Sequence, residues 1–387
     1  MSPQSSNSHS HSHKEQRRRG GLHSAKRSRS NSYSDSKPPS SFSQYRKIPQ
    51  QARQLSFRQL ESGRYLISSA VLPENASWIG VLLSNMKLVV LDESDGLFEE
   101  RFIHLNSIED GPHQICSPSS LHLSFLNGNQ LSNHRVAAPS GFRTWNITLS
   151  ENPESSLSCP FGSIQCAVSS HLLPTFIIVG TDSGVVYAQN CENSEDIIDI
   201  GKLNGSILAM GSLFDFIVIC TTLEVYFVNV LNKNSTDKPR FSGPSLFFSL
   251  PTPFISLTHR PRSSGSSVAH SLCISTQCSI FNILLSSRRE LTFVAYSLLN
   301  ICTELESKVT GACFLHLRDN IVCVVVGKYF VFVNLEHLNR FYFSALDLGL
   351  SDNILSVFPS NIHNSTAYIF SSKGITTVKY LGEILKL

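Results

Sequence analysis

The stretch NIVCVVVGKYFVFVNL, residues 320–335, decides the fold class, because it places two apolar runs on either side of a Gly-Lys pair. The runs are rich in Val and Phe, which favour strands over helices. Nearly every position is apolar, so both faces of such a hairpin would be buried instead of one. The sequence therefore predicts a β-hairpin packed between two other layers.

Six further stretches have the same order of apolar run, polar turn and apolar run. They are residues 78–92, 131–149, 176–190, 216–230, 270–284 and 367–381. A polar residue closes the second run, at Asp92, Asn146, Gln189, Asn229, Asn282 and Asn334, and more loosely Tyr380 takes this place. These positions recur every 40–54 residues. A period of about 40–50 residues is typical of radial or stacked repeats.

A shorter apolar stretch precedes each hairpin. These stretches are residues 63–71, 120–126, 162–168, 205–211, 253–259, 310–316 and 353–359. The repeat unit is therefore predicted to be an inner strand, a hairpin and an outer fourth strand. One unit cannot bury both of its faces, so the units have to pack on one another. We expect an all-β, seven-bladed β-propeller over residues 61–387. Whether a strand near residue 63 pairs beside GITTVKYL (374–381) and closes the ring stays open.

The ends of the hairpins resemble those of WD-repeat proteins, in which the last strand of the hairpin ends in Trp-Asp. This chain has Leu91-Asp92, Trp145-Asn146, Val228-Asn229, Phe281-Asn282 and Val333-Asn334 at that place. It lacks a literal Trp-Asp and a Gly-His at the start of the units. The resemblance covers about residues 61–387 and implies a WD-like propeller that binds other proteins.

The first 60 residues differ in composition from the rest of the chain. They hold 12 Lys and Arg against 2 Asp and Glu, whereas the remainder holds 20 against 27. They are rich in Ser, Arg and His and poor in large apolar residues, so they cannot bury enough surface to offset chain entropy. We expect a disordered basic tail, residues 1–60, joined to an acidic body.

The tail contains two candidate signals. A pair of basic clusters resembles a nuclear-import signal and consists of Arg17, Arg18, Arg19, Lys26, Arg27 and Arg29. The candidate phosphorylation sites are Ser28, Ser30, Ser32 and Ser56, and phosphorylation would cancel part of the positive charge of the tail. We therefore expect import receptors as partners and a nuclear, in part cytoplasmic, location. A solvated basic tail without a signal is the alternative.

The sequence contains none of the common catalytic or cofactor-binding motifs. A nucleophile elbow, a phosphate-binding loop, a dinucleotide fingerprint and metal-ligand spacings are all missing. The ten cysteines are scattered and form no Cys-x-x-Cys pair. No apolar stretch approaches the about 20 residues of a membrane span, and the N-terminal residues do not have the pattern of a secretory signal. We expect no enzyme activity, no cofactor, no metal and no membrane partner.

The leading hypothesis is a protein-interaction scaffold within a nuclear complex. Aromatic, His and Arg side chains in the loops are the expected anchors, and the candidates are Phe142, His259, Arg260, Arg262 and Phe358.

A narrower alternative is a substrate receptor of a cullin-4-type ubiquitin ligase. Residues 44–51, QYRKIPQQ, resemble the leader of one such receptor family, but Trp145-Asn146-Ile147-Thr148 lacks the arginine of the Trp-Asp-x-Arg adaptor motif. A second alternative is a nucleic-acid-associated protein that acts through its basic tail. The acidic body makes specific nucleic-acid binding unexpected.

Overall fold

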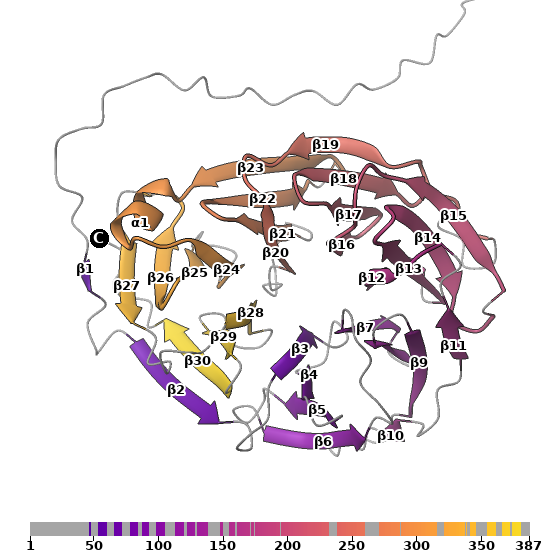
Figure 1. Cartoon of the computed structure of the whole chain (residues 1–387), viewed down its shortest axis with the longest axis horizontal. Coiled ribbons are helices and arrows are strands. Elements are labelled where there is room, and N and C mark those ends of the chain that lie inside the picture. The colour runs from indigo at the N-terminus through magenta and orange to yellow at the C-terminus, as the bar shows by residue number, and fades with distance from the viewer. Residues whose placement is uncertain are drawn as a thin grey trace, which may run out of the picture. The chain divides into compact units, whose positions relative to one another are not determined.

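The computed structural model describes the backbone of residues 161–360 with several gaps, and outside that range only the strands given below (Figure 1). The gaps are residues 171, 174, 194, 232–237, 260–270, 287, 316–320, 337, 339–340 and 346–353. Before residue 161, only the side chains of Leu126 and Leu131 are described. The chain divides into two compact units, Met1–Ser41 and Phe42–Leu387. All described elements lie in the second unit.

This second unit is an all-β domain of seven sheets. Neighbouring strands are antiparallel, except that β1 pairs in parallel with β27. The first sheet consists of β3 (Leu66–Val71), β4 (Trp78–Leu83), β5 (Lys87–Asp92) and β6 (Phe98–His104). The second consists of β7 (His113–Ser119), β8 (His122–Asn127) and β9 (Gln130–Ala137), with the short β10 (Thr148–Leu149) and β11 (Ser155–Ser158) both paired to β9.

The next three sheets have four strands each. The third consists of β12 (Ile164–Ser169), β13 (Phe176–Thr181), β14 (Val185–Asn190) and β15 (Ile197–Lys202). The fourth consists of β16 (Ala209–Leu213), β17 (Phe216–Cys220), β18 (Glu224–Asn229) and β19 (Ser245–Ser249). The fifth consists of β20 (Phe254–His259), β21 (Ser271–Thr276), β22 (Ser279–Leu285) and β23 (Leu291–Ser297), and the short helix α1 (Leu299–Glu304) follows it.

The last two sheets each include a strand from the N-terminal part of the chain. The sixth consists of β24 (Val309–Phe314), β25 (Ile321–Val326), β26 (Tyr329–Asn334) and β27 (Phe341–Ala345), with β1 (Arg46–Lys47) on the outer edge of β27. The seventh consists of β28 (Ile354–Pro359), β29 (Thr366–Ser371), β30 (Gly374–Tyr380) and β2 (Arg53–Gln59). Figure 1 shows β2 beside β30 and β1 beside β27.

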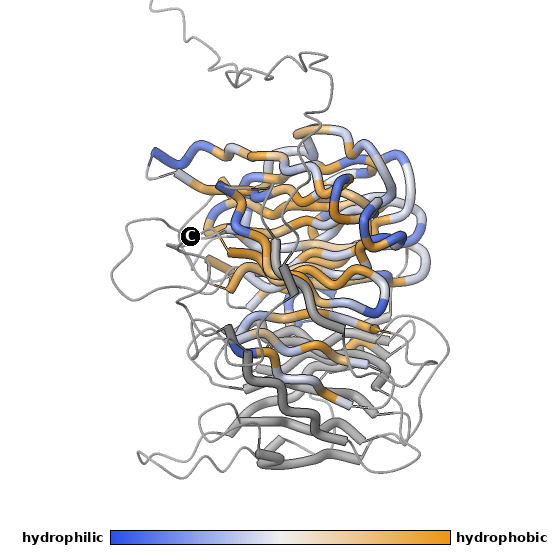
Figure 2. The backbone as a smooth tube through the Cα atoms, turned by 90° about the vertical axis from the view of Figure 1, so that its left-hand side faces the viewer, coloured by the Kyte–Doolittle hydropathy of each residue, from blue (hydrophilic) through white to orange (hydrophobic). Residues whose placement is uncertain are grey.

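The hairpin β25–β26 is buried on both faces, as its apolar composition predicts. Every residue of β25 is buried. Cys323 and Val325 pack in one core cluster with Val357 and Ile369 of the seventh sheet. The alternate residues Val322, Val324 and Val326 pack in another cluster, with Cys273 and Ile280 of the fifth sheet. Figure 2 shows the same distribution along the chain, with apolar strands and hydrophilic turns.

The sequence predicts a basic tail that extends to residue 60, but paired strands begin before that residue. Arg53–Gln59 form β2, which pairs with all seven residues of β30. Leu55 and Phe57 pair with Val378 and Thr376, which are both buried. This alternation of apolar and polar residues is a strand signal that the high charge of the neighbouring tail obscured. The partner of 374–381 is therefore Arg53–Gln59, whereas the stretch 63–71 supplies β3.

The hairpin predicted at residues 131–149 is present as β9–β10, since Ala137 pairs with Thr148 and Val136 pairs with Leu149, but it is not the central hairpin of its sheet. The central hairpin of the second sheet is β8–β9, and its first strand is β7. Gly128-Asn129, between β8 and β9, has the composition of a tight turn. The weakly apolar β7 contains Pro118 and two Ser residues, so it did not stand out. The other six predicted hairpins coincide with pairs of neighbouring strands.

Candidate functional site

The first strands of the seven sheets contact one another in chain order. β3 contacts β7, β7 contacts β12, and the series continues through β16, β20 and β24 to β28, which contacts β3. Glycine permits the close approach at two of these junctions. A Cβ on Gly211 would lie 2.9 Å from Cδ2 of Leu257 in the next sheet, and one on Gly311 would lie 2.8 Å from Cγ2 of Val357. Thr258 adds a hydrogen bond of 3.0 Å to the carbonyl of Ala312, between the fifth and sixth sheets.

Five of the seven first strands share a register irregularity near their start. It lies between Leu66 and Ser68, Ile164 and Cys166, Phe254 and Ser256, Val309 and Gly311, and Ile354 and Ser356. At each irregularity one residue of the first strand has no partner in the second strand, and the residue after it is small. The recurrence shows that these sheets are copies of one unit, and bulges of this kind bend a strand and re-aim its side chains.

Backbone hydrogen bonds join the start of one sheet to the central hairpin turn of the sheet before it. Ile207 donates to the carbonyl of Thr181 (3.1 Å), Phe254 donates to that of Thr222 (2.9 Å), and Val309 donates to that of Gln277 (3.0 Å). These bonds keep the central turns and the links to the next sheets at the same end of the third to sixth sheets. We call this end the turn end.

Buried hydroxyl groups close the turns at this end. Thr181 donates to the carbonyl of Val185 (3.1 Å) and accepts from its backbone N–H (2.9 Å). Thr221 makes the same two bonds with Glu224, both at 3.2 Å. Thr276 and Ser371 donate to the carbonyls of Ser279 and Gly374. All four hydroxyl residues are buried, so the turns are held rigidly.

Large apolar side chains are exposed beside these turns. Phe161 lies next to the third sheet's turn, where its carbonyl accepts a hydrogen bond from Ser183 (2.7 Å). Leu208 begins the fourth sheet, and Leu223 lies in that sheet's turn and is 48% exposed. Leu299 begins α1, directly after Leu298, which donates to the carbonyl of Cys278 in the fifth sheet's turn. The turn end therefore presents apolar groups on a rigid frame.

The charged side chains of the turn end are few, and the two signs nearly balance. Among the described residues with some exposure they are Asp182, Lys202, Glu224, Glu304, Glu306, Lys308 and Lys328. Glu306 has a positive φ of 48°, in a link whose Ser307 lies against Gly327 in the turn of the sixth sheet. A surface with exposed apolar groups and no excess of positive charge suits a protein partner better than a phosphate backbone.

The opposite end of the sheets has a different contact, made by an arginine. Arg289, between β22 and β23, lies over the ring of Phe214 at 5.3 Å and pairs with Asp215 at 3.7 Å. Phe214 and Arg289 both have positive φ, 55° and 59°. The contact joins the fourth sheet to the fifth, so we assign Arg289 a structural role.

The repeat-signature residues fall on two kinds of position. Asp92, Asn229 and Asn334 each end a third strand, opposite the first residue of the second strand. In the third sheet the residue at this position is Asn190, one residue after the predicted Gln189. In the fifth sheet the predicted Asn282 lies inside β22 and does not end it. Asn190 and Asn334 accept hydrogen bonds from the backbone of Glu192 and Glu336, both at 2.9 Å. A polar residue at this position therefore forms the turn that leaves the strand.

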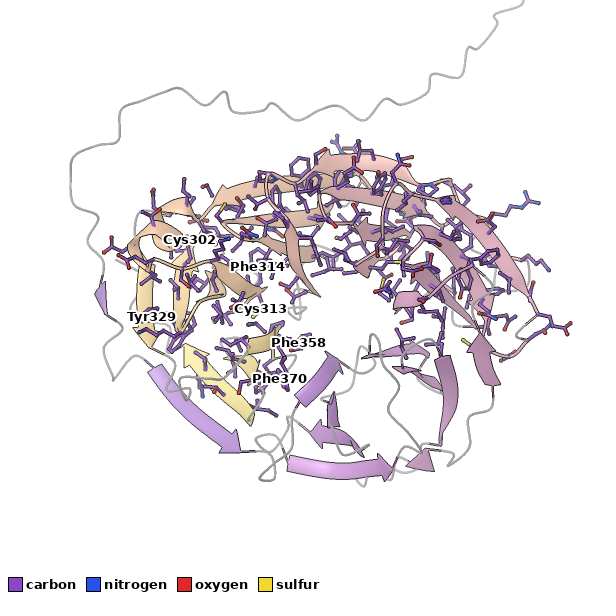
Figure 3. The ribbon with its side chains drawn as sticks, in the orientation of Figure 1. Cys302, Cys313, Phe314, Tyr329, Phe358 and Phe370 are labelled. Carbon is purple, nitrogen blue, oxygen red and sulfur yellow. The ribbon has the colours of Figure 1, made fainter. Side chains whose placement is uncertain are left out.

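Two of the predicted partner-binding residues, His259 and Phe358, lie in described strands of different sheets. His259 ends β20, at the end of the fifth sheet away from the turn end. Phe358 lies in β28 and packs edge-on against Phe370, with ring centroids 5.6 Å apart. Figure 3 labels both residues. Phe142, Arg260, Arg262 and Asn146 lie outside the described residues, as do the basic import-like cluster and Ser28, Ser30 and Ser32. Ser56 lies in β2, opposite Thr377. Sequence reasoning missed the exposed leucines, because a single Leu in a turn carries no signal.

The buried cysteines in the described part of the chain do not have the properties of reactive groups. Seven of the eight described cysteines are buried. Burial raises the pKa of Cys323 to about 12, and burial followed by the charge of Glu192 raises the pKa of Cys191 to about 12. Thiols held protonated in this way are weak nucleophiles. Within the described residues, no three side chains of the His, Cys, Asp and Glu types are placed to hold a metal ion.

Neither a protein-family model nor a curated protein sequence matches this chain. In the part of the chain that the structure describes, no helix has the length and apolar character needed to cross a membrane.

Proposed function

We propose that the seven sheets are the blades of a closed, WD-like β-propeller and that this chain is a non-enzymatic scaffold, a subunit of a multiprotein complex. The contact series of the first strands, which returns from β28 to β3, supports the closed arrangement. The pairing of β2 with β30 supports it as well, because it ties an N-terminal strand to the last sheet.

The observation that carries the scaffold function is the exposure of Phe161, Leu208, Leu223 and Leu299 at the turn end. Apolar groups on a rigid surface with few charges are typical of the centre of a protein interface. The basic tail would bring the chain into the nucleus through import receptors. The turn end has no excess of positive charge, which argues against a nucleic-acid contact there.

The test compares the partners of the full chain with those of two charge variants. Leu223→Glu places a carboxylate at the turn end, and Leu231→Glu places one on a leucine that is 58% exposed at the other end of the same sheet. We expect proteins that co-purify in fixed stoichiometry with the wild type to be lost with Leu223→Glu and kept with Leu231→Glu. Equal retention of those partners by both variants would remove the turn end as the binding surface.

A further inference from the structure

Most outer strands of the sheets are protected against pairing with another chain. β6 carries Glu99, Glu100 and Arg101, and β2 carries Arg53 and Arg58. β15 carries Asp199 and Lys202. The segment before β19 also lies beside the third sheet, because Lys238 forms an ion pair with Asp196 at 2.7 Å and Pro244 lies against Gly201. Charges and covering segments of this kind prevent edge-to-edge association.

Five outer strands contain no charged residue, namely β10, β11, β19, β23 and β27. β10 and β11 have only two and four residues. The outer edge of β27 is already occupied by β1, which pairs with Tyr342 and Phe343. β19 has only five residues and a register irregularity that leaves Phe247 unpaired with β18. Short strands and bulges are further forms of protection.

β23 has none of these protections within the described part of the chain. Its seven residues, LTFVAYS, pair with β22 without a break and include no charge, proline or glycine. Val294 at its centre is 42% exposed. Phe293 packs against Phe247 and Phe248 of β19, with ring centroids 5.3 and 4.1 Å away. These contacts hold β23 in position. A second extended strand can pair with the outward N–H and C=O groups of such an edge in place of water.

The sequence of β23 complements itself about its centre. In an antiparallel pair of two copies, the opposing residues are Val294 with Val294, Phe293 with Ala295, Thr292 with Tyr296 and Leu291 with Ser297. On both sides of Val294, each large residue of one copy lies opposite a smaller residue of the other copy. The aromatic Tyr296 lies opposite the β-branched Thr292, and no like charges face each other. Such pairs stabilise neighbouring strands. A two-fold pairing of identical surfaces is also the commonest form of self-association.

We propose that β23 is a self-association site, through which two copies of this chain join their fifth sheets in antiparallel register about Val294. The inference rests on the edge of one sheet and is independent of the scaffold function. Val294→Lys would place two ammonium groups opposite each other on the two-fold axis, and Val294→Glu would place two carboxylates there.

The experiment measures the mass of the full chain by size-exclusion chromatography with light scattering over a range of concentrations. We expect the wild type at twice 42.9 kDa and each Val294 variant at 42.9 kDa. Mixing Val294→Lys with Val294→Glu should restore the dimer, because opposite charges then meet across the axis. Restoration also shows that both variants are folded.

Leu231→Lys is the matched control, since it adds the same charge to an exposed apolar residue outside β23, and it should remain dimeric. A wild type that is monomeric at every concentration would overturn the proposal. So would a dimeric Val294→Lys, a mixture of the two Val294 variants that stays monomeric, or a monomeric Leu231→Lys.

Discussion

Glycine occupies two of the positions where the first strand of one sheet packs on the first strand of the next. Gly311 faces Val357, and Gly211 faces Leu257 and Leu272, all from other sheets. Any side chain there would overlap a buried neighbour. The sheets therefore approach closely because these residues lack a Cβ atom.

The first prediction concerns Gly311→Ala. Its Cβ would lie 2.8 Å from Cγ2 of Val357, so the variant should lose about 1–3 kcal/mol of unfolding free energy through overpacking. Gly243→Ala is the control, because nothing lies within 4 Å of its Cβ position. Urea unfolding measures both. The double variant Gly311→Ala, Val357→Ala should lose less unfolding free energy than the sum of the losses in the two single variants, because the shorter side chain at position 357 makes room for the new Cβ. Strictly additive losses would show that the contact is absent.

The second prediction concerns pH and the buried thiols. Burial raises the pKa of Cys323 from 9.0 to about 12, so above pH 9 the unfolded chain releases a proton that the folded chain keeps. The stabilisation is complete below pH 9 and is lost as the pH rises toward 12. Cys323→Ala should therefore show a shallower fall in unfolding free energy between pH 8 and pH 10.5. Equal slopes in the variant and the wild type would contradict this reasoning.

At the scale of elements, the hairpins were predictable and the edges of the sheets were not. A run such as Ile321–Val326, apolar at every position and rich in β-branched residues, predicts a strand buried on both faces. β2 was missed because its alternation is short and lies next to a highly charged stretch. The exposed leucines of the turn end could not be predicted, because the sequence does not show which turns meet. Only the hydrogen bonds between sheets bring them to one end.

The third prediction concerns β2 as an element. Removal of residues 1–41 should leave the thermal unfolding midpoint of the sheets unchanged, because these residues form a unit separate from Phe42–Leu387. Removal of residues 1–59 should lower it by roughly 5 °C or more, since β30 loses a seven-residue partner and each kcal/mol shifts the midpoint by about 2–4 °C in large domains. Calorimetry of the two truncated chains measures the difference. Identical midpoints would mean that β2 contributes nothing to the fold.

At the scale of the whole molecule, the account depends on closure of the seven sheets. The sixth sheet buries its two faces against the fifth and seventh sheets, whereas an open series would leave one face of the seventh sheet without such a neighbour. The contact between β28 and β3 is the one that closes the series. A rigid closed frame would also keep the turn end in one shape for a partner.

The most direct test is a distance between spin labels placed at equivalent bulge positions of the first strands. Ile67 in β3, Thr310 in β24 and Leu355 in β28 are such positions, and the buried native cysteines should resist labelling. The reference pair, Thr310→Cys with Leu355→Cys, spans two sheets that are adjacent in the chain. The closed arrangement predicts the same short distance for Ile67→Cys with Leu355→Cys in double electron–electron resonance. A much longer distance for this second pair would contradict closure.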